Sequence, residues 1–466
     1  LFFIGCKGIE KTTPDKELTL PNNFKSFEAV DTSTFADYNW KDIFNDKYLQ
    51  ELISIALENN LDLIQTDKKI QISNNNYNFS KNTLLPSVNT YGNAGQTRFG
   101  DYTMDGVGNY DTNFSPNINE NQKMNKDLPD FHVGLSVGWE VDVWGKLKSR
   151  KKSAYAKFLA SEEGKNLLLS NLICKIAYAY YELISYDYSI YYIKESIVLL
   201  ENALSIIKAQ KEAGLTNELA VQQFEAALYN TKAYEKTINQ KIIETESDIN
   251  MLLGRFPQTI KRTPNIFSIK LPNKLSYGIP SQLLNRRPDI RQSTFNLIAA
   301  NADIDAAKKA FYPSLNINAN GGFKSFNPSF FLNPASLAYN VIGNLSAPLI
   351  NRNEIKRNFK NADANQLIAY YEYQKSILTG YTEVYNQLNN FKNSSEVVEL
   401  KKKETEILSK AVESANALFM SGGATYIEVL LAQMNSLKSK IALSEAKLIQ
   451  LNSHVGLYKA LGGGWK

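Results

Sequence analysis

The chain contains 466 residues, 43% of them hydrophobic and 11% aromatic, with 52 basic and 47 acidic side chains. A net charge of +5 from interspersed residues of both signs argues against a nucleic-acid-binding protein. No run of 18 apolar residues occurs, so no transmembrane helix is expected, whereas 26 tyrosines and 23 phenylalanines suit either a core or the aromatic girdles of a membrane barrel.

The first residues resemble the end of a bacterial secretory signal. Residues 1–5 are apolar or small and precede Cys6, which fits a lipobox whose cysteine becomes the acylated first residue of the mature chain. We therefore expect residues 1–5 to be a signal-peptide remnant and Cys6 to be lipidated. Residues 6–39 are polar, lack periodicity and are interpreted as a lipidated, extended tether. The other cysteine, Cys174, is expected to be a buried thiol without a partner.

A helical pattern of apolar residues begins at Trp40 and continues to about Leu84, where Pro86 ends it. A weaker strand is predicted at about 87–96. Residues 97–130 are rich in Gly, Asn, Asp and Tyr, and this composition predicts a long exposed loop.

The next stretch joins a strand directly to a very long helix. Residues 131–144 alternate between apolar and polar side chains, which is typical of a strand with one apolar face. Residues 145–214 contain no proline and predict a helix about 100 Å long. Gly214 is a helix C-cap candidate, so the chain is expected to turn there and return as a helix at about 217–253. Proline-rich residues 255–286 are interpreted as an extended connector.

The whole pattern then recurs. Pro86-Ser87 corresponds to Pro313-Ser314, 227 residues later, and Leu253-Gly254 corresponds to Leu461-Gly462, 208 residues later. The smaller second spacing reflects a shorter loop in the second half. We interpret this as an internal duplication, with a first repeat at 40–254, a second repeat at 287–466, second-repeat strands at about 314–324 and 336–350, a long helix at about 351–421 and a return helix at 425–461.

Four strands with one apolar face cannot close a barrel, because about eight are needed. Open strand edges are not tolerated in lipid, so the sheet requires either a covering layer or a barrel shared between copies. No segment remains to cover the sheet, which favours the shared barrel, and physical argument alone allows two or three subunits. The predicted fold class is therefore mainly α with a membrane β-barrel, with the long helices projecting into water.

Four motifs in order resemble the TolC-like outer-membrane efflux proteins, also called the outer membrane factor family, and within it the NodT-type lipoprotein branch of efflux systems of the resistance-nodulation-division (RND) class. The resemblance spans almost the whole chain. The motifs are Trp40…Phe44-Asn45-Asp46…Asn60-Leu61-Asp62, Trp139-Glu140-Val141-Asp142-Val143-Trp144-Gly145-Lys146, Arg286-Arg287-Pro288-Asp289-Ile290 followed by Ala310-Phe311-Tyr312-Pro313, and Tyr458-Lys459-Ala460-Leu461-Gly462-Gly463-Gly464-Trp465.

This resemblance implies a homotrimer in the bacterial outer membrane, with a twelve-stranded barrel and a helical barrel that crosses the periplasm. It also implies two protein partners, a periplasmic adaptor and an inner-membrane pump, most often of the RND class. Such a duct needs no cofactor, no metal and no catalytic residue. The exported substrates would be small molecules such as drugs, toxic compounds or metal ions.

The resemblance also carries candidate site residues. The helix-hairpin tips that meet the adaptor in the family correspond here to Gly214, Leu215 and Thr216, and to Gly422, Gly423, Ala424, Thr425 and Tyr426. Family members usually place a basic residue shortly before the second tip glycine, but Phe419-Met420-Ser421 stands there in this chain. The nearest candidates for a charged gate are Glu413, Lys410 and Glu406.

Other functions are compatible with parts of the pattern. The outer-membrane duct of a type I protein secretion system would share the fold, and a lipid-anchored periplasmic coiled-coil scaffold would explain the long helices but not the strands. An enzyme is disfavoured, because His132 and His454 are the only histidines and neither belongs to a metal-spaced pair. No nucleophile-elbow or P-loop pattern occurs either.

Overall fold

A computed structural model describes residues 12–13, 18–25, 27, 34–271, 276–348 and 353–465. The predicted signal remnant and the lipidation site Cys6 lie outside these residues. The chain divides into two compact units. The strand unit is built mainly from Ile72–Phe158 and Phe295–Tyr370, and the helical unit from Asp15–Gln71, Leu159–Thr294 and Tyr371–Lys466.

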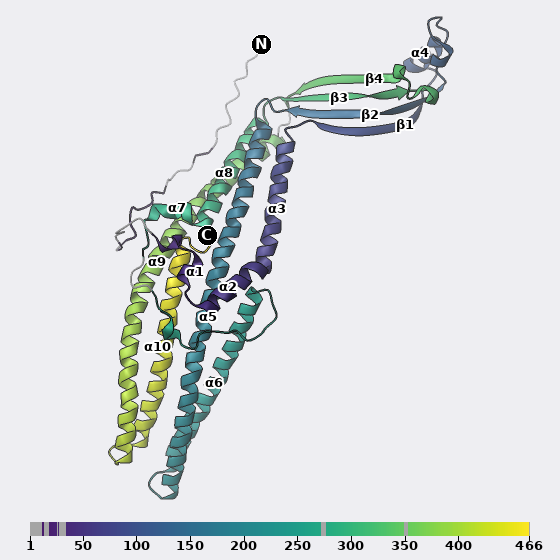
Figure 1. Ribbon diagram of the computed structural model, residues 1–466. Coiled ribbons are helices and arrows are strands. Elements are labelled where there is room, and N and C mark those ends of the chain that lie inside the picture. The colour runs from purple at the N-terminus through teal and green to yellow at the C-terminus, as the bar shows by residue number, and fades with distance from the viewer. Residues whose placement is uncertain are drawn as a thin grey trace. The chain divides into compact units, whose positions relative to one another are not determined.

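The strand unit contains one four-stranded antiparallel sheet, in the order β1-β2-β3-β4 (Figure 1). Each strand pairs with the next strand along the chain. Residues 99–126 join the first strand to the second and residues 326–336 join the third to the fourth, whereas the long and mostly helical stretch 142–313 lies between the second and the third. The strands are β1 (Ser87–Arg98), β2 (Asp127–Val141), β3 (Ser314–Ser325) and β4 (Leu337–Ser346). Strand β2 begins four residues before the expected start at 131 and ends before Val143, while β4 ends at Ser346 rather than at 350.

The long loop expected at 97–130 is exposed, but it contains regular elements that the sequence did not predict. This segment contains the helix α4 (Met104–Thr112), a short 3-10 turn at Glu120–Gln122 and the first residues of β2. The Asn113 side chain accepts a hydrogen bond from the Met124 amide (2.8 Å) and donates one to the Met124 carbonyl (2.8 Å), which closes the segment on itself. Composition alone missed this order because asparagine side chains can replace backbone partners in irregular structure.

A carboxylate explains how β2 passes directly into the long helix α5 (Lys146–Glu212). Asp142 accepts hydrogen bonds from the amides of Leu147 (2.9 Å) and Lys148 (2.8 Å), which otherwise have no partner at a helix start. The indole of Trp144 donates to the Pro313 carbonyl (2.7 Å), which ties the junction to the start of β3. The Asp-Val-Trp-Gly motif is therefore a structural device that ends a strand and starts a helix.

The expected single helix from Trp40 to Leu84 is interrupted twice. It consists of α1 (Trp40–Ile43), α2 (Lys47–Asn59) and α3 (Leu61–Asn82). Asp46 caps α2 by accepting from the Tyr48 amide, and Asn60 accepts from the Leu63 amide at the start of α3. Short polar side chains favour such caps over helix interiors, and this preference prevailed over the apolar periodicity.

Two antiparallel helix pairs dominate the helical unit (Figure 1). The first pair is α5 with α6 (Glu218–Leu252), and the second is α9 (Asn353–Met420) with α10 (Tyr426–Ala460). The short α7 (Leu283–Arg286) and α8 (Pro288–Lys309) precede β3. The main apolar core joins side chains from α2, α5, α6, α9 and α10, and a smaller cluster that includes Leu200, Phe224 and Leu430 joins the two pairs closer to their turns.

The expected tether at 6–39 is not wholly extended or exposed. Phe24 is buried and stacks on Tyr381 at a ring-centroid distance of 5.3 Å, and Ala36 is buried within the 3-10 turn Phe35–Asp37. Burial of these two residues could not be predicted, because single apolar residues in a polar segment have no periodicity.

Two of the motifs that carry the family resemblance fold against each other. The Arg287 side chain donates to the Ala460 carbonyl (2.8 Å) and forms ion pairs with Asp289 (2.6 Å) and Glu383 (2.7 Å). The Trp465 indole donates to the Gly462 carbonyl (2.8 Å) and the Arg286 carbonyl (3.1 Å). These contacts join the start of the second repeat to the end of the chain within the helical unit.

Helix α5 contains an 18-residue window that is long and apolar enough to cross a membrane. More than half of this window is buried within the structure, as in the core helix of a helical bundle. We therefore assign it to the core of the helical unit.

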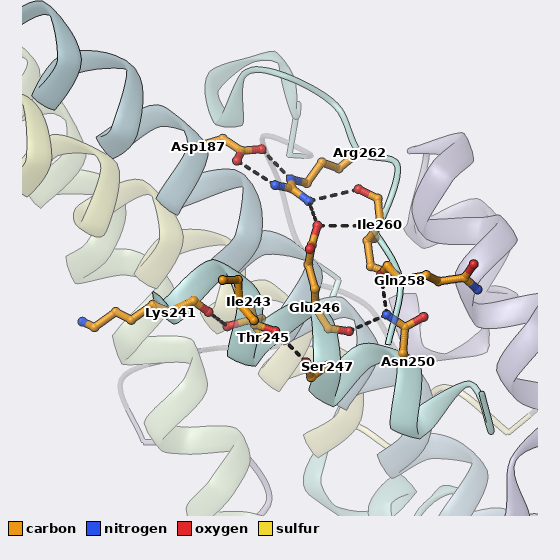
Figure 2. Close-up of polar contacts among 10 residues, drawn as sticks. All are labelled: Asp187, Lys241, Ile243, Thr245, Glu246, Ser247, Asn250, Gln258, Ile260 and Arg262. Carbon is orange, nitrogen blue, oxygen red and sulfur yellow. Dashed lines mark hydrogen bonds and ion pairs between the residues drawn. The ribbon is translucent and has the colours of Figure 1, made fainter. Parts of the chain in front are cut away.

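An arginine attaches the connector after α6 to both helices of the first pair (Figure 2). Arg262 donates two hydrogen bonds to Asp187 of α5 (2.5 and 2.8 Å) and one to Glu246 of α6 (2.5 Å). These carboxylates raise the pKa of Arg262, although partial burial alone would lower it. The connector predicted at 255–286 is thus extended but fixed at this point.

We expect Arg262→Met to loosen the connector strongly. The substitution leaves Asp187 and Glu246 facing an apolar side chain. Because these side chains are 14–29% exposed, the cost lies between the about 0–1 kcal/mol of an exposed ion pair and the about 3–5 kcal/mol of a fully buried one. Amide hydrogen exchange across the connector should accelerate by about tenfold or more. Lys261→Met removes a neighbouring exposed charge and is the control. Equal exchange in both variants would show that the Arg262 network does not hold the connector.

Candidate functional site

One face of the sheet is apolar across all four strands. In the observed register Val88 pairs with Val137, Val137 with Ala319, and Ala319 with Val341. The side chain of Val341 is 67% exposed, and much of this face is exposed with it. Water disfavours a continuous apolar surface of this kind, whereas lipid does not. Other exposed members of the face are Val88, Leu135, Leu337, Tyr339 and Leu345.

The opposite face of the same sheet is polar and rich in amides. Asn318 of β3 lies between Gly138 of β2 and Ile342 of β4, and Asn320 lies between Ser136 and Asn340. The other asparagines of this face are Asn89, Asn93, Asn316 and Asn344. Such a surface suits a water-filled lumen, because amides hydrogen bond to water without carrying charge.

The sheet has two edges that need partners. Among the residues that the structure describes, strands β1 and β4 each pair on one side only, so each presents a row of backbone groups to its surroundings. In lipid an unpaired edge is too costly to persist, and four strands cannot close on themselves. An apolar face and two open edges together require other strands, which further copies of the chain can supply.

Both helix pairs turn through the same glycine motif. Gly214 has φ of +73° and Gly422 has φ of +77°, the left-handed conformation that favours glycine. The amide of Leu215 donates to the Gln210 carbonyl (2.8 Å), and that of Gly423 donates to the Leu418 carbonyl (2.7 Å). This is the Schellman arrangement of a helix C-terminus. Equivalent turns 208 residues apart support the interpretation of a duplicated chain.

The candidate tip residues lie in these turns, and the structure adds apolar neighbours to them. Leu215 is 77% exposed in the first turn, and Met420 is 76% exposed at the second. Leu219, Leu418 and Ile427 are also exposed. The sequence interpretation named Leu215 but missed the other four, because isolated apolar residues at a helix end resemble ordinary surface residues. Each turn therefore presents an apolar tip.

Polar groups hold the second turn. The Glu428 carboxylate accepts hydrogen bonds from the Thr425 amide (2.6 Å) and hydroxyl (2.9 Å), and these bonds lower the pKa of Glu428. The spacing Thr425-x-x-Glu428 is a capping box that could have been read from the sequence. In the first turn Lys211 forms an ion pair with Glu218 across the turn, and Asn217 accepts from the Ala220 amide.

The three gate candidates lie on α9 without a shared contact. Glu406, Lys410 and Glu413 are all exposed. Glu413 lines a cavity of about 200 Å³ between α5, α9 and α10, together with Glu195 and Lys440. A single chain therefore places the candidates on one helix but gives none of them a gating contact.

The structure offers no reactive centre in the part of the chain that it describes. No group of three or more metal-ligating side chains occurs among these residues. His132 lies on the polar face of β2, with its Nε2 2.7 Å from the Tyr91 hydroxyl. Burial lowers the pKa of His454 to about 4, which leaves a weak base at neutral pH. Cys174 is buried as expected, and burial raises its pKa to about 12.

A sequence profile described as outer membrane efflux protein matches residues 52–255 and 279–463. The toluene efflux pump outer membrane protein TtgF of Pseudomonas putida is 27% identical over 439 residues, covering 92% of this chain and 86% of the relative. The probable outer membrane lipoprotein SilC of Salmonella typhimurium is 25% identical over 472 residues, covering 99% and 96%.

A solved structure shows the same fold. The CmeC outer membrane channel of Campylobacter jejuni superposes with a TM-score of 0.85 at 21% identity, covering 98% of this chain and 95% of CmeC. The matched region includes both helix pairs and all four strands, since it spans nearly the whole chain.

Proposed function

The chain belongs to the outer membrane efflux protein family, and from this premise we propose that three copies form a passive exit duct for small molecules. The family consists of outer-membrane transport channels and not of enzymes, which confirms the family resemblance and the expected location. The observation that carries the proposal is the four-stranded sheet with an exposed apolar face and two open edges. Three such sheets would close a twelve-stranded barrel with the asparagine-rich face inside.

The duct would work with two further proteins. We propose that a periplasmic adaptor docks on the two apolar tips around Gly214, Leu215 and Thr216 and around Gly422, Gly423, Ala424, Thr425 and Tyr426. An inner-membrane pump, of the RND class, would supply the energy. Exposed leucine and methionine side chains at the tips support docking, because a helical adaptor could bury them.

The proposal also includes a lipid anchor, a charged constriction and two repeats. Cys6 would be acylated and anchor the chain to the membrane, which the lipoprotein description of SilC supports. Glu413, Lys410 and Glu406 would form a charged constriction when three copies bring their α9 helices together. The repeats would be 40–254 and 287–466.

The cargo of the relatives supports efflux of small molecules. TtgF is described as part of a toluene efflux pump, which favours small-molecule export over the type I protein secretion alternative. A periplasmic scaffold would leave the exposed apolar face of the four-stranded sheet in water, so this alternative does not explain that face.

Particle imaging of detergent-extracted, membrane-expressed protein tests the assembly. We expect threefold particles with a tapered helical stem, because the helix pairs of three copies must pack around one axis. Monomeric, water-soluble particles would contradict the barrel. Export of a hydrophobic dye by cells that lack their own duct, with a matching adaptor and pump supplied, tests the transport role.

A further inference from the structure

The start of α5 carries a basic segment that the proposed duct does not explain. Between Val143 and Ser161 the chain has six basic residues and no acidic one. Basic side chains at a helix start oppose the helix dipole, and the first turn of α5 contains no acidic residue to offset them. A local rule broken without gain in stability often marks a functional surface. The six residues are Lys146, Lys148, Arg150, Lys151, Lys152 and Lys157.

Only part of this charge is neutralised within the chain. Lys146 forms an ion pair with Glu140 (2.5 Å), and Lys157 forms one with Asp303 (2.9 Å). Lys148, Arg150 and Lys152 are exposed and form no ion pair with any residue that the structure describes. Asp142 already holds the amides at the helix start, so a bound anion would meet side chains rather than backbone. Three cations therefore remain available to an external partner.

Aromatic side chains stand beside these cations. Trp144 and Tyr312 are each 48% exposed, and their rings lie 5.3 Å apart. Together with Arg150 and Lys309 they line a cavity of about 230 Å³ at the end of the sheet. Tryptophan and tyrosine beside basic residues are typical of the zone where a membrane meets water.

We propose that Lys148, Arg150 and Lys152, with Trp144 and Tyr312, bind the phosphate groups of anionic phospholipids in the leaflet nearest the helices. This inference rests on the proposed barrel, whose strands end at this junction. The headgroup layer is about 5–8 Å thick on each side of a bilayer. Residues 148–152 lie within about 10 Å of the helix start, since a helix rises about 1.5 Å per residue. The basic segment therefore lies at the depth of the phosphates.

Lipid binding explains these basic and aromatic residues better than a position inside the lumen of the duct. A wide aqueous lumen offers little to the exposed rings of Trp144 and Tyr312, whereas the interface offers these rings an apolar side and a polar side. Lys148 and Lys152 are four residues apart and therefore share one side of α5, whereas Arg150 lies on nearly the opposite side. Cations on two sides of the helix suit a layer of headgroups more than a single small ligand.

The test compares phosphatidylglycerol with phosphatidylcholine on the full-length protein. Purified protein is titrated with each lipid in detergent and the bound lipid is counted by native mass spectrometry. Attraction of basic residues near a lipid surface predicts a preference for phosphatidylglycerol of about tenfold or more, weakened by salt. The variant Lys148→Gln/Arg150→Gln/Lys152→Gln should lose this preference. Lys401→Gln/Lys402→Gln/Lys403→Gln removes three charges elsewhere and should keep it.

Two results would overturn the inference. A preference that survives in the first variant would place the lipid elsewhere, and a change in the ion selectivity of the channel without a change in lipid preference would place these cations in the duct. Single-channel conductance of the same samples tests separately whether the protein forms the proposed duct. If the unaltered protein conducts ions but shows no lipid preference, only the proposed lipid site is contradicted. If the unaltered protein does not conduct ions, the proposed duct is contradicted. Should the triple variant misfold, Arg150→Gln alone should reduce the preference in the same direction.

Discussion

Val341→Arg is expected to abolish insertion of the protein into the outer membrane. Val341 is the fifth residue of the ten in β4, on the apolar face that we assign to lipid. An arginine at the midplane of a membrane strand costs about 2–4 kcal/mol, and a trimer would bear this cost three times. The neighbour of Val341 across the strand pair is Ala319, so an arginine here would face an apolar side chain rather than an acidic one.

The adjacent residue provides the control. Asn340 lies on the polar face and pairs with Asn320, so Asn340→Arg should place its charge in water and leave insertion intact. Insertion is measured as the fraction of protein in the outer membrane that resists extraction with urea. Equal insertion of both variants would contradict the assignment of the faces, and failure of Asn340→Arg alone would reverse it.

Gly422→Val is expected to abolish export while leaving insertion unchanged. The φ of +77° at Gly422 is unfavourable for any side chain and most of all for a β-branched one. A Cβ added at this position would meet no atom within 4 Å, so the effect would come mainly from the backbone conformation. We expect the turn to change shape and the affinity for the adaptor to fall by about tenfold or more, since 1.4 kcal/mol of strain corresponds to one factor of ten.

A substitution at the neighbouring Gly423 is the control, because it adds a side chain without changing the conformation of the turn. Gly423 has no positive φ, and an added Cβ would lie 3.4 Å from the Leu418 side chain, a contact that a flexible leucine can accommodate. Gly423→Ala should therefore export normally. Growth in the presence of a toxic substrate and co-purification of the adaptor measure the two effects. Normal export by Gly422→Val would show that the exact form of this turn is not needed for docking.

The main architecture could be read from periodicity. The change from alternating residues at 131–144 to a proline-free stretch located the junction between β2 and α5 to within a few residues, because the two periods differ so strongly. The glycines of the two turns were also visible, since few residues other than glycine adopt a positive φ at a helix end. The apolar and polar faces of the strands followed from the same alternation.

Only the tertiary structure decided how distant residues combine. The order within 97–130, the burial of Phe24 and the contacts of Arg262 with Asp187 and Glu246 each join residues that are far apart in sequence or lack a repeating pattern. Periodicity reports which side of an element faces the core, but it contains no information about which partner lies there. The sequence by itself therefore determined the long helices, the four strands and the faces of the strands. The pairing of the four strands in one sheet and the contacts of Arg287 and Trp465 that join the two ends of the second repeat emerged only when the chain was folded.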